Sequence, residues 1–302
     1  MRLPHPIFMV CLAVLFGCTL DATMKATTLG GTGVITATAW RYILAALIML
    51  VIFVAMRKPM PGWKAIRFHL LRAIAQTSSS VTFFYALTQI TLAEAVVMGF
   101  TAALMIAPIA RVVLGEKMSA ITVGASVVGF LGAALAISGE STGMPVDGNR
   151  LYGIGAMLFS AVGYALNIVL LRMRTREEDS LTLVTFMNVL PALFLLPFLP
   201  FVGPLPESNG WPLLGGAAFA AIGIWWFMTL AYARAKAQTL APFEYTGLIW
   251  SSLLGYVLFH EIPSLRLYAG ASIIILACLV VAFETHFTAR REARAAAAEI
   301  AP

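Results

Sequence analysis

The most constraining feature of this sequence is a series of apolar runs, each roughly 20 residues long, separated by short polar gaps. A helix of that length crosses the ~30 Å hydrocarbon core of a bilayer. Barrel strands would alternate apolar and polar residues, and these runs do not. The composition agrees, because 60% of the 302 residues are hydrophobic and only 11% are charged, unlike a soluble domain. The sequence therefore predicts an all-α integral membrane protein.

Ten transmembrane helices are predicted, at residues 6–28, 33–56, 68–90, 92–114, 119–138, 151–172, 181–202, 212–234, 240–259 and 265–285. The connections between them are short, so they leave no room for a soluble domain. The N-terminal run resembles a signal peptide, but it continues to Leu29 and further spans follow it. We therefore expect it to be retained as the first span.

Positively charged residues predict the orientation, because Lys and Arg accumulate in cytoplasmic loops. They cluster in the even-numbered connections and in the tail, whereas the odd-numbered connections contain only Arg150 and Arg266. Both termini are therefore predicted to be cytoplasmic, with the chain in a bacterial inner (plasma) membrane. This bias also explains the net charge of +6, so no nucleic-acid partner is predicted.

The chain repeats itself. The stretch "FGCTLDATMK" (16–25) matches "VGYALNIVLL" (162–171) at an offset of 146, which aligns Asp21 with Asn167, and Glu116 near the end of one half matches Glu261 in the other. The matches predict two five-helix units, at 1–140 and 150–286, followed by a cytoplasmic tail at 287–302. Because five is odd, the second unit enters the membrane from the opposite side. Such inverted repeats are typical of carriers that work by alternating access.

The stretch 84–137 resembles the repeat unit of EamA-type carriers in the drug/metabolite transporter superfamily, and 231–283 resembles a second copy. The resemblance covers the full chain. It implies a ten-helix secondary carrier of small metabolites, with a central cavity between the halves and no ATPase machinery. The sequence agrees on the last point, since it has no phosphate-binding G-x-x-x-x-G-K-[ST] loop. A coupling proton or counter-substrate, the direction of transport and a homodimer are left open.

Asp21 and Arg41 are the charged residues that stand out in the first two spans. Both lie some ~10–12 Å from the outer ends of their helices, at ~1.5 Å per residue. They could grip substrate or act as a gate, or they could form a buried ion pair that only joins two helices, with Lys25 as a further partner. Both interpretations remain open.

Glu244 raises a similar question near the start of the ninth span. Pro242 suits the first turn of a helix, and a carboxylate there is favoured by the helix dipole. Alternatively, Glu244 faces the inner part of the cavity with Tyr245 and Trp250 nearby, and binds substrate or a proton. Glu94, Glu116 and Glu261 lie at span ends and are interpreted as helix-end or gating groups.

Aromatic and amide side chains within the spans are candidates for substrate specificity, although aromatic residues also form interfacial belts. The candidate substrate-binding residues are Asp21, Arg41, Gln76, Ser79, Tyr164, Asn167, Asn188, Trp225, Trp226, Glu244, Tyr245 and Trp250. Such a lining suits a flat solute that forms hydrogen bonds. Riboflavin is the first candidate, and the alternatives are S-adenosylmethionine or another nucleoside-like metabolite, or export of amino acids or drugs.

Other classes of protein are less well supported. Neither H-E-x-x-H nor G-x-S-x-G occurs, so we expect no enzyme. The scattered Cys and His residues predict no disulfide, metal site or cofactor. A channel is disfavoured by the inverted repeat. Ala125, Gly129 and Ala133, at four-residue spacing, predict close helix packing.

Overall fold

The computed structural model describes residues 5–115, 118–139, 141, 149–172, 179–203, 205–208, 210–232, 234, 240 and 243–300. Within these residues the regular elements are α-helices and one 3-10 helix, with no β-strand. The first half contains α1 (Pro6–Leu29), α2 (Val34–Ala55), α3 (Trp63–Leu87), α4 (Leu92–Gly99), α5 (Thr101–Leu114) and α6 (Ala120–Ile137). The second contains α7 (Arg150–Arg172), α8 (Ser180–Leu195), η1 (Leu196–Phe201), α9 (Gly210–Tyr232), α11 (Gly247–Phe259) and α12 (Leu265–Ile300).

Eight helical stretches in the described residues are long and apolar enough to cross a membrane. They correspond to the predicted spans other than the third and the ninth. At the third, α3 has 25 residues but includes Arg67, His69 and Arg72. At the ninth, α11 has only 13 residues, which is too short to cross the hydrocarbon core alone.

The predicted continuous helix at 240–259 is wrong in one respect, because Tyr245 and Thr246 form a turn and α11 begins at Gly247. The Thr246 hydroxyl donates to the Phe243 carbonyl at 2.7 Å, a local bond that competes with regular helix. The fourth span is interrupted in the same way at Phe100, where the Thr101 hydroxyl donates to the Met98 carbonyl at 2.6 Å. At the offset of 146 residues, Phe100 corresponds to Thr246.

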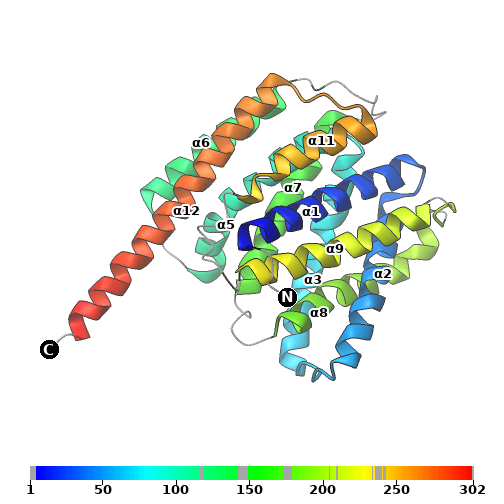
Figure 1. The fold of residues 1–302 in the computed structure, drawn as a ribbon, viewed down its shortest axis with the longest axis horizontal. Helices are drawn as coiled ribbons and strands as arrows, with labels where there is room; N and C mark the ends of the chain where they lie inside the picture. The colour runs from blue at the N-terminus through cyan, green and yellow to red at the C-terminus, as the bar shows by residue number, and fades with distance from the viewer. Residues whose placement is uncertain are drawn as a thin grey trace.

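The packing of the helices repeats when the two halves are exchanged. α1 packs on α9 as α7 packs on α3, and α1 packs on α11 as α7 packs on α5. α2 packs on its counterpart α8, and α6 on its counterpart α12. Figure 1 shows α1, α9 and α11 side by side, with the α6–α12 pair at one edge. The pattern of contacts between helices therefore reflects the two-repeat architecture.

Small residues bring α6 and α12 into close contact, as the spacing of Ala125, Gly129 and Ala133 predicted. A Cβ added at Gly270 of α12 would lie 2.4 Å from the carbonyl oxygen of Gly132. A Cβ at Gly129 would lie 3.2 Å from that of Ala277. The backbones approach so closely that a side chain at these positions would force the helices apart.

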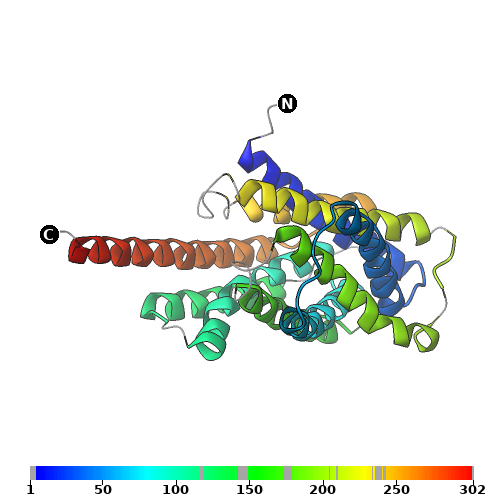
Figure 2. The same cartoon turned by 90° about the horizontal axis from the view of Figure 1, so that it is seen from below.

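The helix α12 continues well beyond the predicted span at 265–285 and ends at Ile300. Most of the predicted tail at 287–302 is therefore helical. In Figure 2 this red segment extends away from the rest of the bundle.

Candidate functional site

A chain of hydrogen bonds joins three helices in the middle of the bundle. Asn167 of α7 donates through its amide nitrogen to the Gln76 side-chain oxygen of α3. Gln76 donates to the Tyr42 hydroxyl of α2 at 3.3 Å, and that hydroxyl lies 2.7 Å from the Ser80 hydroxyl. The oxygen of the Asn167 amide is buried and has no hydrogen-bond partner. We call Tyr42, Gln76, Ser80 and Asn167, together with Arg41, the central polar cluster.

Arg41 is only 4% exposed, and its guanidinium carbon lies 3.6 Å from the Tyr42 ring centroid and 5.6 Å from that of Phe84. Its Nε is buried without a hydrogen-bond partner. Asp21 of α1 attracts this cation electrostatically, but the two side chains do not form an ion pair. The guanidinium is therefore stabilised by aromatic faces and by a carboxylate that does not touch it.

Two other predicted residues form bonds within the protein. Ser79 donates to the Ser160 carbonyl at 2.9 Å, and the Ser160 hydroxyl donates back to the Ser79 carbonyl at 2.8 Å. These bonds join α3 to α7. Asn188 donates to the Val184 carbonyl of its own helix at 2.9 Å. Their polar groups are thus at least partly satisfied by neighbouring backbone.

Glu244 lies just before α11, and Thr246 is the residue that caps that helix. Residues 240, 243 and 244 are helical, and Pro242 lies outside the described residues, so the helix-dipole interpretation of Glu244 stays a prediction. Tyr164 of α7 is 45% exposed and lies within electrostatic range of the Glu244 carboxylate. The neighbouring Tyr245 ring meets Phe100 edge to face, with centroids 5.1 Å apart. The interruptions of the two halves therefore touch.

The three predicted tryptophans differ in their surroundings. Trp250 and Trp225 are half-buried, and the indole nitrogen of Trp250 is buried without a hydrogen-bond partner. Trp226 is 60% exposed on α9. A role in substrate binding stays a prediction for all three.

Tyr42 and Ser160 were not identified as candidates from the sequence, and of the three mid-span serines 78–80 only Ser79 was chosen as a candidate. Tyr42 directly follows Arg41, and an aromatic residue beside a charge inside an apolar run was a usable signal. Ser80 stands in a run of three serines, in which the sequence alone does not distinguish the inward-facing members. Ser160 gave no such signal.

A second group of polar residues gathers around the first turn of α4, and we call Lys25, Thr91, Glu94, Arg150 and Glu261 the α4 network. Lys25 donates to Glu261 at 2.5 Å and to the Ile90 carbonyl at 2.7 Å. The second oxygen of Glu261 accepts from the Leu92 backbone nitrogen at 2.7 Å. The sequence-based pairing of Lys25 with Asp21 is therefore wrong, because Glu261 offers the ammonium a closer carboxylate.

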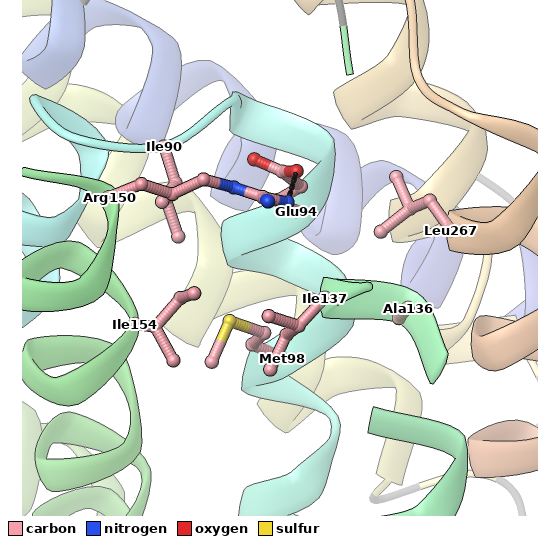
Figure 3. A pocket seen from close by; sticks show the side chains of 8 residues that line it. All are labelled: Ile90, Glu94, Met98, Ala136, Ile137, Arg150, Ile154 and Leu267. Carbon is pink, nitrogen blue, oxygen red and sulfur yellow. Dashed lines mark hydrogen bonds and ion pairs between the residues drawn. The ribbon is translucent and has the colours of Figure 1, made fainter. Parts of the chain in front are cut away.

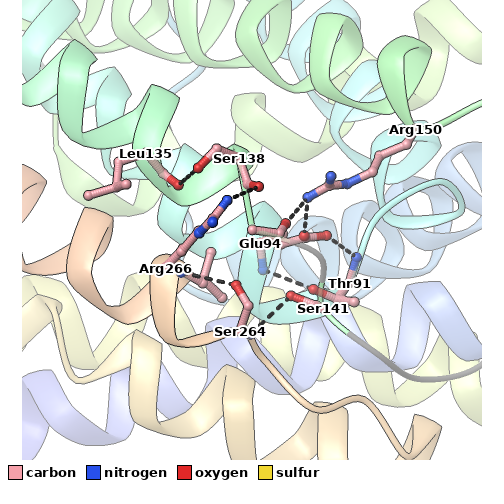
Figure 4. A network of polar contacts seen from close by, with 10 residues as sticks. Thr91, Glu94, Leu135, Ser138, Ser141, Arg150, Ser264 and Arg266 are labelled. Carbon is pink, nitrogen blue, oxygen red and sulfur yellow. Dashed lines mark hydrogen bonds and ion pairs between the residues drawn. The ribbon is translucent and has the colours of Figure 1, made fainter.

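Glu94 forms a capping box with Thr91 at the start of α4 and an ion pair of 2.7 Å with Arg150 of α7. Arg150 also donates to the Gly139 carbonyl at 2.6 Å. Figure 4 shows these contacts beside the bonds of Arg266 to Ser138 and of Ser264 to Ser141. Glu94 and Glu261 are thus helix-end groups, as predicted, and both cap α4. The predicted counterpart Glu116 lies outside the described residues.

Directly below the Glu94–Arg150 pair, apolar side chains from α4, α6, α7 and α12 close the space (Figure 3). Met98, Ile137, Ile154 and Leu267 are among them, and the gap between them is too small for a water molecule. The contact between these four helices is therefore closed to water below the ion pair.

No group of three His, Cys, Asp or Glu side chains that could hold a metal ion occurs in the part of the chain that the structure describes. Cys11, Cys18 and Cys278 are free thiols.

Comparison with known proteins shows the family to which this chain is similar. The model of the EamA-like transporter family matches residues 5–138 and again 151–283. The chain is 27% identical to a riboflavin transporter of Brucella anthropi, with 83% of this chain and 88% of that protein covered. It is 24% identical to an S-adenosylmethionine uptake transporter of Rickettsia prowazekii, covering 71% of each. A crystal structure with 17% sequence identity has the same fold, with a TM-score of 0.62 over 94% of this chain and 98% of that one.

Proposed function

Because the chain belongs to the EamA-like transporter family, we propose that it is a secondary carrier that moves a small flat-ring metabolite across a bacterial inner membrane by alternating access. Members of the family and the relatives are named as transporters. The chain is therefore a multi-pass membrane transporter of a small molecule and not an enzyme. The proposal adds the mechanism, the site and the substrate class.

The observation that carries the proposal is the contact between the interrupted helices of the two halves. Carriers built from repeats bind substrate near the bilayer midplane, where helices of both repeats are discontinuous. Here Phe100 and Tyr245 mark matching interruptions and touch each other. Glu244 precedes one of them, and the central polar cluster lies mid-span on α2, α3 and α7. We therefore place the substrate between these two groups.

The topology belongs to the same proposal: ten spans, two inverted halves and both termini in the cytoplasm. The length of α3 supports it as a span, and the helical residues 243–244, before the turn at Tyr245 and Thr246, add length to the stretch that contains the short α11. The repeat of the packing under exchange of the halves supports a twofold relation between them. An odd number of spans in each half makes that relation an inversion.

Riboflavin is the proposed substrate. The relative from Brucella anthropi is named for riboflavin, and the candidate site offers aromatic faces together with unpaired polar atoms. Arg41 and Trp250 present donors, and the Asn167 oxygen presents an acceptor. A flat heteroaromatic ring with carbonyl and imide groups can stack on the aromatic faces and form hydrogen bonds with these polar atoms.

S-adenosylmethionine is the second candidate, because Asp21 and Arg41 attract each other without forming an ion pair. A solute with an ammonium and a carboxylate group could bind between two such separated charges. The relative named for S-adenosylmethionine uptake supports this alternative.

Uptake into proteoliposomes distinguishes these substrates. We expect the purified protein to give saturable uptake of radiolabelled riboflavin, reduced by an excess of unlabelled riboflavin and unaffected by S-adenosylmethionine. Protein-free liposomes are the control. Saturable uptake of S-adenosylmethionine alone would move the assignment to the second candidate, and a flux that never saturates would contradict a carrier.

A further inference from the structure

We propose that the α4 network is the gate that closes one end of the transport pathway, and that separating Lys25 from Glu261 and Glu94 from Arg150 opens it. The inference rests on the proposed alternating-access function. By the distribution of basic residues, this end faces away from the cytoplasm. The partners, distances and burial of the residues in the α4 network argue for a gate between the halves rather than a permanent bond within one half.

Apart from the bond of Lys25 to the Ile90 carbonyl, the long-range bonds in the network join one half of the chain to the other. Lys25 of α1 pairs with Glu261 of the second half, and Glu94 of α4 pairs with Arg150 of α7. The Gly139 carbonyl accepts from Arg150, and the Ser138 carbonyl accepts from Arg266 at 3.2 Å. Relative movement of the halves at this end must therefore break these bonds together.

Burial makes the Lys25–Glu261 contact behave as a switch. Their side chains are 1% and 3% exposed, so neither charge is hydrated in this arrangement. An unpaired charge in a membrane interior is costly, and the two ions therefore stay together until water enters between them. An intermediate with the charges apart and dry is disfavoured, which leaves a closed state and a wet open state.

Glycines allow the halves to approach at this end. A Cβ added at Gly139 would lie 3.1 Å from the Cβ of Ser264, and one at Gly153 would lie 2.6 Å from that of Gln89. Gly255, within the second half, leaves room for the Glu261 side chain, because an added Cβ would lie 2.7 Å from its carboxylate oxygen. A side chain at Gly153, or one larger than cysteine at Gly139, would hold the halves apart, since the neighbouring atoms already fill the space.

The opposite end provides a matched contrast. Lys58 of the first half and Asp179 of the second form an ion pair of 3.0 Å, but their side chains are 29% and 48% exposed. Exposed pairs contribute little and are easily replaced by water. This pair also joins the halves, but it lacks the burial that makes the α4 network a switch.

The gate can be tested without knowing the substrate. Spin labels at Leu29→Cys and Ile262→Cys, in a background with Cys11, Cys18 and Cys278 replaced by Ser, report the distance across the Lys25–Glu261 contact; both positions are exposed. In lipid nanodiscs we expect one narrow distance distribution for this background. Glu261→Gln and Lys25→Met should each add a longer component, whereas Lys58→Met should not.

Arg150→Met provides a second route if the buried variants fail to fold, because the Arg150 side chain is 38% exposed. It should add the same longer component. Identical distance distributions in the background, in Arg150→Met and in whichever buried variant folds would overturn the proposal.

A reversible lock links the gate to transport. The Cβ atoms of Gly139→Cys and Ser264→Cys would lie 3.1 Å apart, so a small outward shift reaches the ~3.8 Å separation of a disulfide and lets oxidation cross-link the two halves. Oxidation should reduce riboflavin or S-adenosylmethionine uptake at least tenfold, and a reductant should restore it; each single cysteine variant is the control. Unchanged uptake in the oxidised pair would overturn the gate. If neither substrate is transported, the substrate assignment fails while the distance measurement still decides the gate.

Discussion

Arg41 shows at the scale of a single residue how this bundle accommodates a charge in its interior. Its guanidinium is almost fully buried, lies over Tyr42 and Phe84, and is attracted by Asp21. A planar, weakly hydrated cation suits such a position better than an ammonium. The buried Nε lacks a partner inside the protein, which agrees with the proposal that Arg41 binds substrate when the site opens.

The Asp21–Arg41 relation predicts a measurable coupling. Arg41→Met leaves Asp21 without its cation, and we expect the free energy of unfolding to fall by about 3–5 kcal/mol. Asp21→Asn in the same protein should recover about 0.5–3 kcal/mol of that loss, since the remaining charge is then removed. Denaturant unfolding in detergent micelles measures all three variants. Strictly additive losses would show that the two charges do not interact.

Among the elements, the interrupted helices and the α6–α12 pair use small or hydroxylated residues in different ways. At Thr101 and Thr246 the side-chain hydroxyl donates a hydrogen bond to a backbone carbonyl three residues earlier, and the helix is interrupted there. At Gly132 and Gly270 the absence of a side chain lets two continuous helices touch. The first feature positions Glu244 and Tyr245, and the second supports the frame around them.

The packing of α6 on α12 predicts different effects on stability when two glycines are replaced by alanine. Gly270→Ala should lower the free energy of unfolding by about 1–3 kcal/mol, because the new methyl group meets the backbone of Gly132 and Ala136. Gly124→Ala, on α6, is the matched control, since nothing lies within 4 Å of its added Cβ. Thermal unfolding followed by tryptophan fluorescence compares them. Equal melting temperatures for the two variants would contradict the close contact.

At the scale of the whole molecule, exchanging the two halves relates the end that contains the α4 network to an opposite end that has different residues. The network around α4 depends on Lys25, which aligns with Leu171 at the offset of 146 that relates Asp21 to Asn167. The two ends of the carrier therefore differ in chemistry although their helices are related. We expect an asymmetric transport cycle in which this end has the more strongly bonded closed state.

The inverted topology is tested by reporter fusions in cells. A reporter that is active only in the cytoplasm should be active after Arg57 and inactive after Gly143, because an odd number of proposed spans separates these positions. A reporter active only outside the cytoplasm should give the reverse result. The same response at both sites would rule out the inversion.

The sequence by itself determined that this is a helical membrane protein with two related halves. Hydropathy and length are local properties, so each apolar run identifies its own helix wherever its neighbours lie. It also identified Asp21, Arg41, Glu94, Glu244 and Glu261, because a charge inside or beside such a run is visible without knowing its partner.

Only the tertiary structure decided which of these charges meet. Lys25 and Glu261 lie 236 positions apart, and nothing local to Lys25 indicates that this carboxylate is closer than Asp21. The same holds for Gln76 and Asn167, which are 91 positions apart, and for the contact between Phe100 and Tyr245. The physical reason is that partner choice depends on how separate helices pack, whereas the helices themselves form from bonds between near neighbours.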